Sequence, residues 1–402
     1  MKKKAIIHII TKLELGGAQK IALTLLRKLN ASPTNNLATD LDSETFLISG
    51  SKGTLIDTIK NNPNVILLNS LVREVSLKNF LWLEIKNFIK LIVILRSFKK
   101  KYTNIIVHTH STKAGLVGRW AAFFAGIKNR VHTIHGFGFN DYQRWFVRWP
   151  IIMLEWITSL ITTQFICVSS KDALKGIQLF PRFAKKYSLI RAAIDTEKFY
   201  TPARKTVIEE PNILPNDIPA ATNKKNSPFI FGTISAFTQP GKNIPEMIRA
   251  FKYVHNHNPN TRLEIVGDGI LRPLIEEAIA YHQLENHVTL HGWQEHVAPF
   301  MSTWNAFVMS SLWEGLPCAV VEARSMKLPV ITYDTGGISD IIKHRKNGLI
   351  YQQKYWLNLA NGMLELSLNP HLNDTLSSHL DDLSNFSYHA MVNQHVELYK
   401  SL

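Results

Sequence analysis

The sequence predicts an α/β protein of two successive doubly wound domains that face a central cleft. Short apolar runs alternate with amphipathic helical stretches, a pattern typical of parallel sheets covered by helices. This alternation begins at residue 5 and begins again at residue 229. Between the two series, residues 201–228 are rich in proline and polar side chains, as expected for a linker. A chain of 402 residues is also too long for one ordinary core.

In the first series, strands are expected where β-branched and other apolar residues run together. Helices are expected where apolar residues recur every three or four positions. The expected strands are residues 5–10, 45–48, 65–68, 105–108, 130–134 and 165–168. The expected helices are residues 18–29, 80–98 and 114–125. These elements define a first Rossmann-like domain over residues 1–200.

The second series follows the same pattern. Its expected strands are residues 229–234, 262–266, 288–290, 306–309 and 330–332. Its expected helices are residues 245–255, 271–281, 317–326 and 338–343. They define a second Rossmann-like domain over residues 229–385. Residues 386–402 are expected to form a terminal helix that packs back on the first domain.

Positive charge is concentrated in the first half of the chain. Residues 1–200 hold 30 Lys and Arg against 12 Asp and Glu, an excess of 18, whereas the remainder holds 16 against 19. The first half should therefore face something anionic, such as lipid headgroups, a phosphate-bearing acceptor or nucleic acid. Nothing ties these basic residues to a known nucleic-acid-binding motif, which argues against that class.

Two stretches of the first half interleave basic residues with aromatic and aliphatic ones, at residues 80–102 and 141–156. This composition suits an interfacial helix on anionic lipid, and it equally suits a core-facing helix with a solvated basic edge. Residues 149–168 are apolar but interrupted by Glu155 and by several Ser and Thr, so we expect a core or interfacial helix rather than a membrane span. The apolar run after the basic residues 2–4 is too short for a signal peptide and reads as a buried strand.

The most informative motif lies at residues 310–322. A strand is expected to end at Met309, a loop then holds Glu314 and Gly315, and Pro317 suits the first position of a helix. Backbone amides at a helix start favour a phosphate, and a carboxylate at Glu322 can accept hydrogen bonds from a ribose diol. The alternative is an ordinary helix start with one acidic residue before it and one on its surface.

The stretch from Ser310 to Gly337 resembles the donor-site signature of glycosyltransferase family 4. The family pattern is a Glu, a small turn and a second Glu eight positions on, then an apolar strand and a Gly-Gly pair. Here these elements are Glu314, Gly315-Leu316-Pro317, Glu322, Leu328-Pro329-Val330-Ile331 and Gly336-Gly337, and Asn347-Gly348-Leu349 also fits. The resemblance implies the two-domain GT-B fold, a retaining mechanism, an acceptor-binding first domain and a donor-binding second domain.

The resemblance also implies roles for single residues of the second domain. Glu322 would bind the donor ribose, and Glu314 would act beside the donor sugar hydroxyls. Donor-binding backbone amides would come from Gly315, Leu316 and Pro317. Lys242, otherwise an ordinary surface lysine, would contact the diphosphate. The family's usual Arg in that loop is replaced here at Ala236 or its neighbours, and Arg324 is a candidate substitute.

In the first domain the resemblance places Gly17, in a Gly-Gly turn before a helix, over the donor diphosphate. His135 lies where a strand should end, and both this position and the resemblance favour a catalytic role beside the donor sugar, against the alternative of a structural histidine. Ser111 and Lys113 follow another strand end. Lys113 could contact an acceptor phosphate, while Ser111 could contact the acceptor or, more simply, cap the next helix.

No metal or cofactor is expected beyond the nucleotide-sugar donor, for which a UDP-sugar is the expectation from the family. His108, His110, His132 and His135 resemble a metal site only superficially, because no carboxylate or Cys accompanies them. The expected acceptor is a glycan or a polyprenyl-diphosphate-linked glycan at the inner face of the cytoplasmic membrane, with no nucleic acid as partner. The alternative enzyme is a nucleotide-sugar epimerase of the same fold, and the alternative class is a basic nucleic-acid-binding protein.

Overall fold

The computed structural model describes residues 4–14, 16–31, 42–69, 80–199, 227–353 and 355–402. It divides into two compact units. The first comprises Met1–Ile194, Trp313–Cys318 and Ser384–Leu402, and the second comprises Asp195–Leu312 and Ala319–Leu383. The expected linker, residues 201–228, lies almost wholly outside the described residues.

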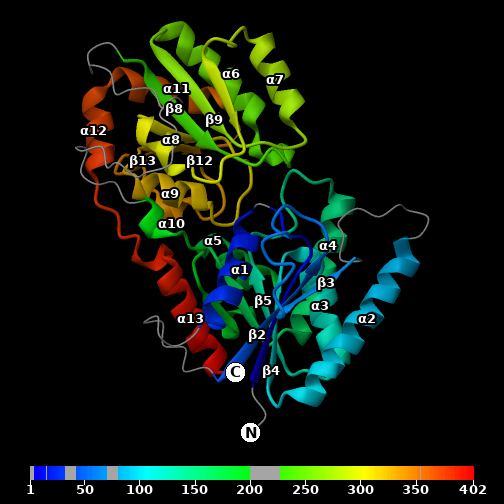
Figure 1. The fold of residues 1–402 in the computed structure, drawn as a ribbon. Helices are drawn as coiled ribbons and strands as arrows, with labels where there is room; N and C mark the ends of the chain where they lie inside the picture. The colour runs from blue at the N-terminus through cyan, green and yellow to red at the C-terminus, as the bar shows by residue number, and fades with distance from the viewer. Residues whose placement is uncertain (1–3, 15, 32–41, 70–79, 200–226, 354) are drawn as a thin grey trace. The chain divides into compact units, whose positions relative to one another are not determined.

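The first unit is a parallel sheet of seven strands in the order β3-β2-β1-β4-β5-β6-β7 (Figure 1). Its strands are β1 (Lys4–Ile10), β2 (Ser43–Gly50), β3 (Val65–Leu68), β4 (Ile105–His110), β5 (Asn129–Ile134), β6 (Gln164–Cys167) and β7 (Tyr187–Leu189). Its helices are α1 (Gly17–Leu29), α2 (Phe80–Lys101), α3 (Thr112–Phe124), α4 (Trp145–Ile161), α5 (Ser170–Leu179) and α13 (Tyr388–Lys400). The central strands are buried on both faces, because helices cover a parallel sheet from both sides.

The second unit is a parallel sheet of six strands in the order β10-β9-β8-β11-β12-β13. Its strands are β8 (Phe229–Ile234), β9 (Thr261–Val266), β10 (Val288–Gly292), β11 (Ala306–Met309), β12 (Val330–Tyr333) and β13 (Gly348–Tyr351). Its helices are α6 (Ile244–His257), α7 (Arg272–Tyr281), α8 (Ala298–Thr303), α9 (Cys318–Ser325), α10 (Ile338–Ile341), α11 (Trp356–Leu368) and α12 (Pro370–Ser378). The predicted fold class, two doubly wound parallel sheets, is confirmed.

Helix α4 turns its polar side chains inward and its apolar side chains outward. Glu155, Thr158 and Ser159 are its buried residues, while Trp145 is 73% exposed and Trp149 63% exposed. Thr158 and Ser159, which interrupt the apolar stretch 149–168, therefore lie on the buried side of α4. No helix in the described part of the chain is long and apolar enough to cross a membrane.

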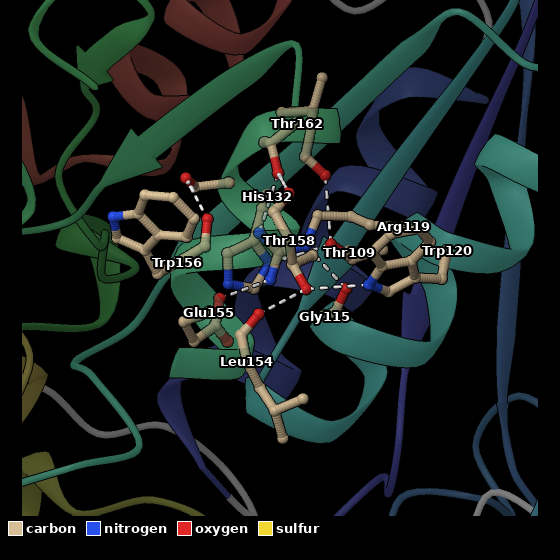
Figure 2. A network of polar contacts seen from close by, with 12 residues as sticks. Thr109, Gly115, Arg119, Trp120, His132, Leu154, Glu155, Trp156, Thr158 and Thr162 are labelled. Carbon is tan, nitrogen blue, oxygen red and sulfur yellow. Dashed lines mark hydrogen bonds and ion pairs between the residues drawn. The ribbon is translucent and has the colours of Figure 1, made fainter. Parts of the chain in front are cut away.

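The inward face of α4 is held by a network centred on Arg119 of α3 (Figure 2). The fully buried guanidinium of Arg119 donates to the Glu155 carboxylate at 2.7 Å, to the Thr162 hydroxyl at 3.0 Å and to the Gly115 carbonyl at 2.7 Å. The Trp120 indole donates to the Thr158 hydroxyl at 3.0 Å. Each buried polar group is thus hydrogen-bonded, which is the condition for burying it at all.

Candidate active site

The predicted donor-binding residues of the second unit lie where the strand order reverses. Strand β8 pairs with β9 on one side and β11 on the other, and ligands of doubly wound sheets bind beyond the carboxyl ends of such strands. The loop after β8 carries Lys242, and the loop after β11 leads to Glu314. The Ser310 hydroxyl donates to the Lys242 carbonyl at 2.8 Å, and the Leu312 amide donates to the Gly241 carbonyl at 2.8 Å. The structure therefore makes these two predicted loops neighbours.

The loop around Ala236 is also held from the other side of β8, by a feature that the sequence analysis did not identify. The Phe237 amide donates to the Asp268 carbonyl at 2.9 Å. Gly267 has φ of 140°, and a Cβ there would lie 1.8 Å from the Ser235 carbonyl oxygen, so only glycine fits. Two glycines flanking Asp268 directly after a buried strand were the signal available in the sequence.

The residues after β11 fold as a buried turn that leads into α9. Gly315, Leu316 and Pro317 are buried, whereas Glu314 and Glu322 are half-buried. Helix α9 begins at Cys318, one residue later than expected, so Pro317 precedes the helix instead of occupying its first position. Glu322 lies on the second turn of α9, past the amide-bearing end. The amides of this turn and the Glu322 carboxylate therefore come from one short segment.

Arg324 is not a substitute for the missing arginine of the diphosphate site. Its side chain is 2% exposed and points into the second unit, where it donates to the Asp381 carboxylate at 2.7 Å. Its remaining donors reach the carbonyls of Leu328 at 2.7 Å and His379 at 3.2 Å. Because its guanidinium is fully buried and donates to these protein groups, Arg324 ties α9 to the segment after α12 and does not face a ligand site.

In the first unit, the predicted residues lie at the carboxyl ends of β1 and β4, where that sheet also reverses its order. Gly17 is the exposed first residue of α1, and Lys113 is the half-buried second residue of α3. Ser111 occupies the N-cap position of α3 with φ of 66°, but its side chain makes no capping hydrogen bond. It lies instead 3.1 Å from the Thr11 hydroxyl, which joins the loops after β1 and β4. The capping interpretation of Ser111 is therefore wrong.

His135 directly follows β5 and is half-buried. Its Nε2 lies 3.1 Å from Nδ1 of His110, and burial lowers the pKa of His135 to about 3. The imidazole is therefore neutral at physiological pH, so it can donate one hydrogen bond and accept another but carries no charge. The segment Trp313–Cys318 belongs to the same unit, and a Cβ on Gly315 would lie 2.3 Å from the His135 carbonyl oxygen. The backbones of His135 and of the Glu314 turn are thus in contact.

The histidines of the first unit fall into two groups, separated by the sheet. His132 points to the α3 face, where its Nδ1 lies 2.9 Å from the Thr109 hydroxyl. His108 and His110 point to the other face, where His8 of β1 and His395 of α13 join them, neither of which sequence reasoning had included. His8, His108 and His110 each offer a nitrogen within 4.8 Å of the others. The predicted set of four is therefore not one cluster, although three other histidines do converge.

Two family models match the chain. The model described as "Glycosyltransferase Family 4" matches residues 59–198, and the model described as "Glycosyl transferases group 1" matches residues 216–380. Each model matches most of one of the two predicted domains.

Curated proteins and solved structures agree with these matches. The chain is 31% identical over 333 residues to an Escherichia coli UDP-Gal:alpha-D-GlcNAc-diphosphoundecaprenol alpha-1,3-galactosyltransferase, covering 81% of each chain. It is 23% identical to the capsular polysaccharide biosynthesis glycosyltransferase CapM of Staphylococcus aureus, over 74% of this chain and 75% of that protein. Its fold matches HepE of Anabaena, solved with UDP and glucose, at a TM-score of 0.74 with 17% identity, covering 99% and 100% of the two chains.

Proposed function

Because the chain belongs to glycosyltransferase family 4, we propose that it moves a sugar from a UDP-sugar to a hydroxyl of a polyprenyl-diphosphate-linked glycan, with retention of configuration. The observation that carries this proposal is the joining of the Lys242 loop to the Glu314 loop at the reversal point of the second sheet, by two hydrogen bonds of 2.8 Å. The Glu314 loop belongs to the family signature, and the resemblance assigns Lys242 of the other loop to the diphosphate. The E. coli relative, by its name, uses a UDP-sugar and a diphosphoundecaprenol-linked acceptor.

The proposed chemistry uses positioned donors and no side-chain nucleophile. The Lys242 ammonium and the backbone N–H groups of Gly315 and Leu316 stabilise the departing diphosphate, and Gly17 lets the start of α1 approach it. The acceptor hydroxyl attacks the face that the diphosphate leaves, and a diphosphate oxygen takes its proton. Glu314 holds the donor sugar hydroxyls, and the neutral His135 offers them a hydrogen-bond partner. Ser111 and Lys113 bind the acceptor. We expect turnover without added metal.

The first test removes the carboxylate assigned to the ribose. Glu322→Ala should weaken UDP binding about 10- to 100-fold, because a hydrogen bond to a charged group contributes about 1.5–3 kcal/mol. Isothermal titration calorimetry with UDP measures the effect. Glu277→Ala, which removes an exposed carboxylate on α7, is the matched control and should bind UDP as the wild type does. Unchanged affinity in Glu322→Ala would refute the ribose assignment.

The proposed acceptor requires the protein to reach a membrane surface, and we assign this contact to the outward face of α4. Trp145, Trp149, Met153 and Leu160 are each more than half exposed there. A helix that satisfies its polar groups inside and presents aromatic residues outside suits the headgroup region of a bilayer. The excess of 18 positive charges over residues 1–200 favours an anionic surface. On this basis we propose a peripheral location for the protein, at the cytoplasmic side of the membrane.

A vesicle-binding experiment tests this surface. Replacing Trp145 and Trp149 together by Ser should weaken partition onto vesicles containing phosphatidylglycerol by at least about tenfold, since burying one aromatic side chain contributes about 1.5–3 kcal/mol. Trp293→Ser, which removes a 45% exposed indole of the second unit, is the control and should partition like the wild type. Equal binding by the double variant and the wild type would exclude α4 as the contact.

A further inference from the structure

Three imidazoles form a continuous chain from the candidate active site into the first sheet. Nε2 of His135 lies 3.1 Å from Nδ1 of His110, and Nε2 of His110 lies 3.0 Å from Nδ1 of His8. The chain arises because β1, β4 and β5 are neighbours and His8 and His110 both point to the face covered by α13. His8 and His110 are fully buried. Nothing in the proposed reaction uses these two side chains.

The geometry couples the tautomers of the three rings. Each contact joins Nδ1 of one ring to Nε2 of the next, so a hydrogen bond needs a proton on one of these atoms and a lone pair on the other. A neutral imidazole carries a single N–H. If Nδ1 of His8 carries the proton, then Nε2 of His110 accepts, and the proton of His110 is on Nδ1 and faces His135. The three rings must therefore all be Nδ1–H or all be Nε2–H.

The surroundings of the three imidazoles of His8, His110 and His135 keep all of them neutral. Burial lowers the pKa of His8 and of His135 to about 3 and holds the pKa of His110 well below its usual value. The neighbouring side chains are His108, His395 and the Tyr399 phenol, and the neighbouring histidines further disfavour an additional proton. Burial likewise holds the pKa of Tyr399 well above its usual value, so the phenol is uncharged. The three rings must therefore share one tautomer throughout the physiological pH range.

We propose that His110 and His8 are positioning residues that fix the tautomer and the ring orientation of His135 during sugar transfer. This proposal rests on the proposed role of His135 beside the donor sugar. Because Nε2 of His135 is engaged by His110, the nitrogen left for a sugar hydroxyl is Nδ1. The hydrogen-bonded series His8–His110–His135, which we call the relay, determines whether Nδ1 of His135 donates or accepts a hydrogen bond. His135 then need not select a tautomer in each catalytic cycle, which is a form of preorganisation.

The same residues also raise the possibility of a metal site, and the hydrogen bonds favour the relay. In a site formed by His8, His108 and His110, His108 would be a ligand. Its Nδ1 lies 2.5 Å from the Tyr399 hydroxyl and its Nε2 lies 2.6 Å from the Thr133 hydroxyl, so both nitrogens are engaged elsewhere. No carboxylate or thiolate belongs to the cluster among the residues that the structure describes. A buried divalent cation would then lack any negative partner, which is costly.

The direct experiment reads the tautomers in the intact wild-type protein. Long-range ¹H–¹⁵N correlation spectra of protein labelled with ¹⁵N-histidine distinguish Nδ1–H from Nε2–H rings, and single replacements of His8, His110 and His135 assign the three signals. We expect all three rings to be neutral at pH 7 and to show the same tautomer. Two rings with different tautomers, or one charged ring, would overturn the relay. This measurement needs no substrate, so it judges the relay even if no sugar transfer is found.

Kinetics of three variants then test whether the relay serves turnover. His110→Leu should lower kcat about tenfold with KM for the donor changed less than twofold, because it removes alignment of His135 and no donor contact. His110→Asn, whose amide lies near the former Nδ1 and can still reach His135, should recover part of the loss. His108→Leu is the matched control on the same strand and face, and its kcat should stay within about twofold of the wild type.

Each other outcome counts against the proposal. Equal losses in His108→Leu and His110→Leu would indicate general damage to the cluster, or a metal site if turnover also falls on treatment with a chelator and returns with Zn²⁺. A wild-type kcat in His110→Leu would show that the relay has no role in turnover. Thermal unfolding of all three variants, with and without UDP, establishes that the proteins compared are folded and bind nucleotide.

Discussion

Acidification below about pH 6.5 should unfold the first unit cooperatively. His8, His108, His110, His132 and His395 are each at most 4% exposed, and burial lowers the pKa of all five, to about 3 for His8 and about 4 for His395. The unfolded chain takes up a proton at each of them below about pH 6.5, and the folded unit does not. The free energy of unfolding therefore has its full value well above that pH, and it falls as the pH decreases toward the lowered pKa values of the folded histidines.

The expected loss is comparable to the whole stability of a domain. At pH 5.5 each histidine accounts for about 1.4 kcal/mol, so five together account for about 7 kcal/mol, against a typical total of about 5–15 kcal/mol. Urea unfolding followed by circular dichroism at pH 7.5, 6.5, 6.0 and 5.5 measures how steeply the free energy of unfolding falls with pH. His395→Leu should reduce the slope by about one proton, whereas His389→Gln, at an exposed position on the same helix, should not. A pH-independent unfolding free energy would contradict the neutral histidine cluster.

Glu155→Ala should cost about 3–5 kcal/mol, because it leaves the fully buried guanidinium of Arg119 without its counter-charge. The two side chains make a 2.7 Å ion pair between α3 and α4, and both lie away from water. Thermal or urea unfolding at pH 7.5 measures the loss. Lys60 and Asp57, a 2.9 Å pair on the surface, provide the comparison, and Asp57→Ala should leave the stability nearly unchanged because solvent screens this pair.

A double variant separates the charge from the packing. Arg119→Met combined with Glu155→Leu removes both charges and keeps apolar volume, so it should be more stable than Glu155→Ala alone. Suppose that the double variant instead loses as much unfolding free energy as the two single variants, Arg119→Met and Glu155→Leu, lose together. In that case the pair contributes through the further hydrogen bonds of Arg119 to Gly115 and Thr162 and not through its charge. This outcome would contradict the expectation drawn from burial of the pair.

The positions of the strands in both sheets follow from patterns that the sequence shows directly. Strands buried on both faces read as continuous apolar runs, so β3, β8 and β11 were located without error and most others to within two residues. The main differences lie at strand ends. Strand β4 continues through Thr109 to His110, because two polar residues can extend a buried strand when neighbouring strands supply partners, as His132 does for Thr109 and His8 does for His110.

Helix α4 shows why burial cannot always be read from hydropathy. Its apolar residues left a core helix and an interfacial helix open. The side that is buried is the one with Glu155 and Thr158, because Arg119 and Trp120 of α3 supply hydrogen-bond partners for it. Such partners are distant in sequence and leave no periodic signal. Elements such as β7 and α12 were missed for a simpler reason, since they are short and contain few apolar residues.

The same distinction between local motifs and long-range contacts applies to the candidate site. The local signals of the Glu314 turn, Lys242 and His135 were found because each is a short motif at a strand end. The part played by Arg324 was not predictable, since its partner Asp381 is 57 residues away in sequence and no pattern links the two. The His8–His110–His135 chain was missed because His8 lies on β1, which is the neighbour of β4 in the sheet but not in the sequence.

The first unit is assembled from the two ends of the chain, and this has a consequence for its synthesis. Helix α13 covers the histidine-bearing face of the first sheet through Tyr399 and His395, and Ile194 donates its amide to the Phe386 carbonyl at 2.8 Å. A ribosome must make the whole second unit before the residues that complete the first one emerge. Until then, several histidine side chains that are buried in the folded protein remain exposed to water. We therefore expect the nascent chain to depend on chaperones during this interval.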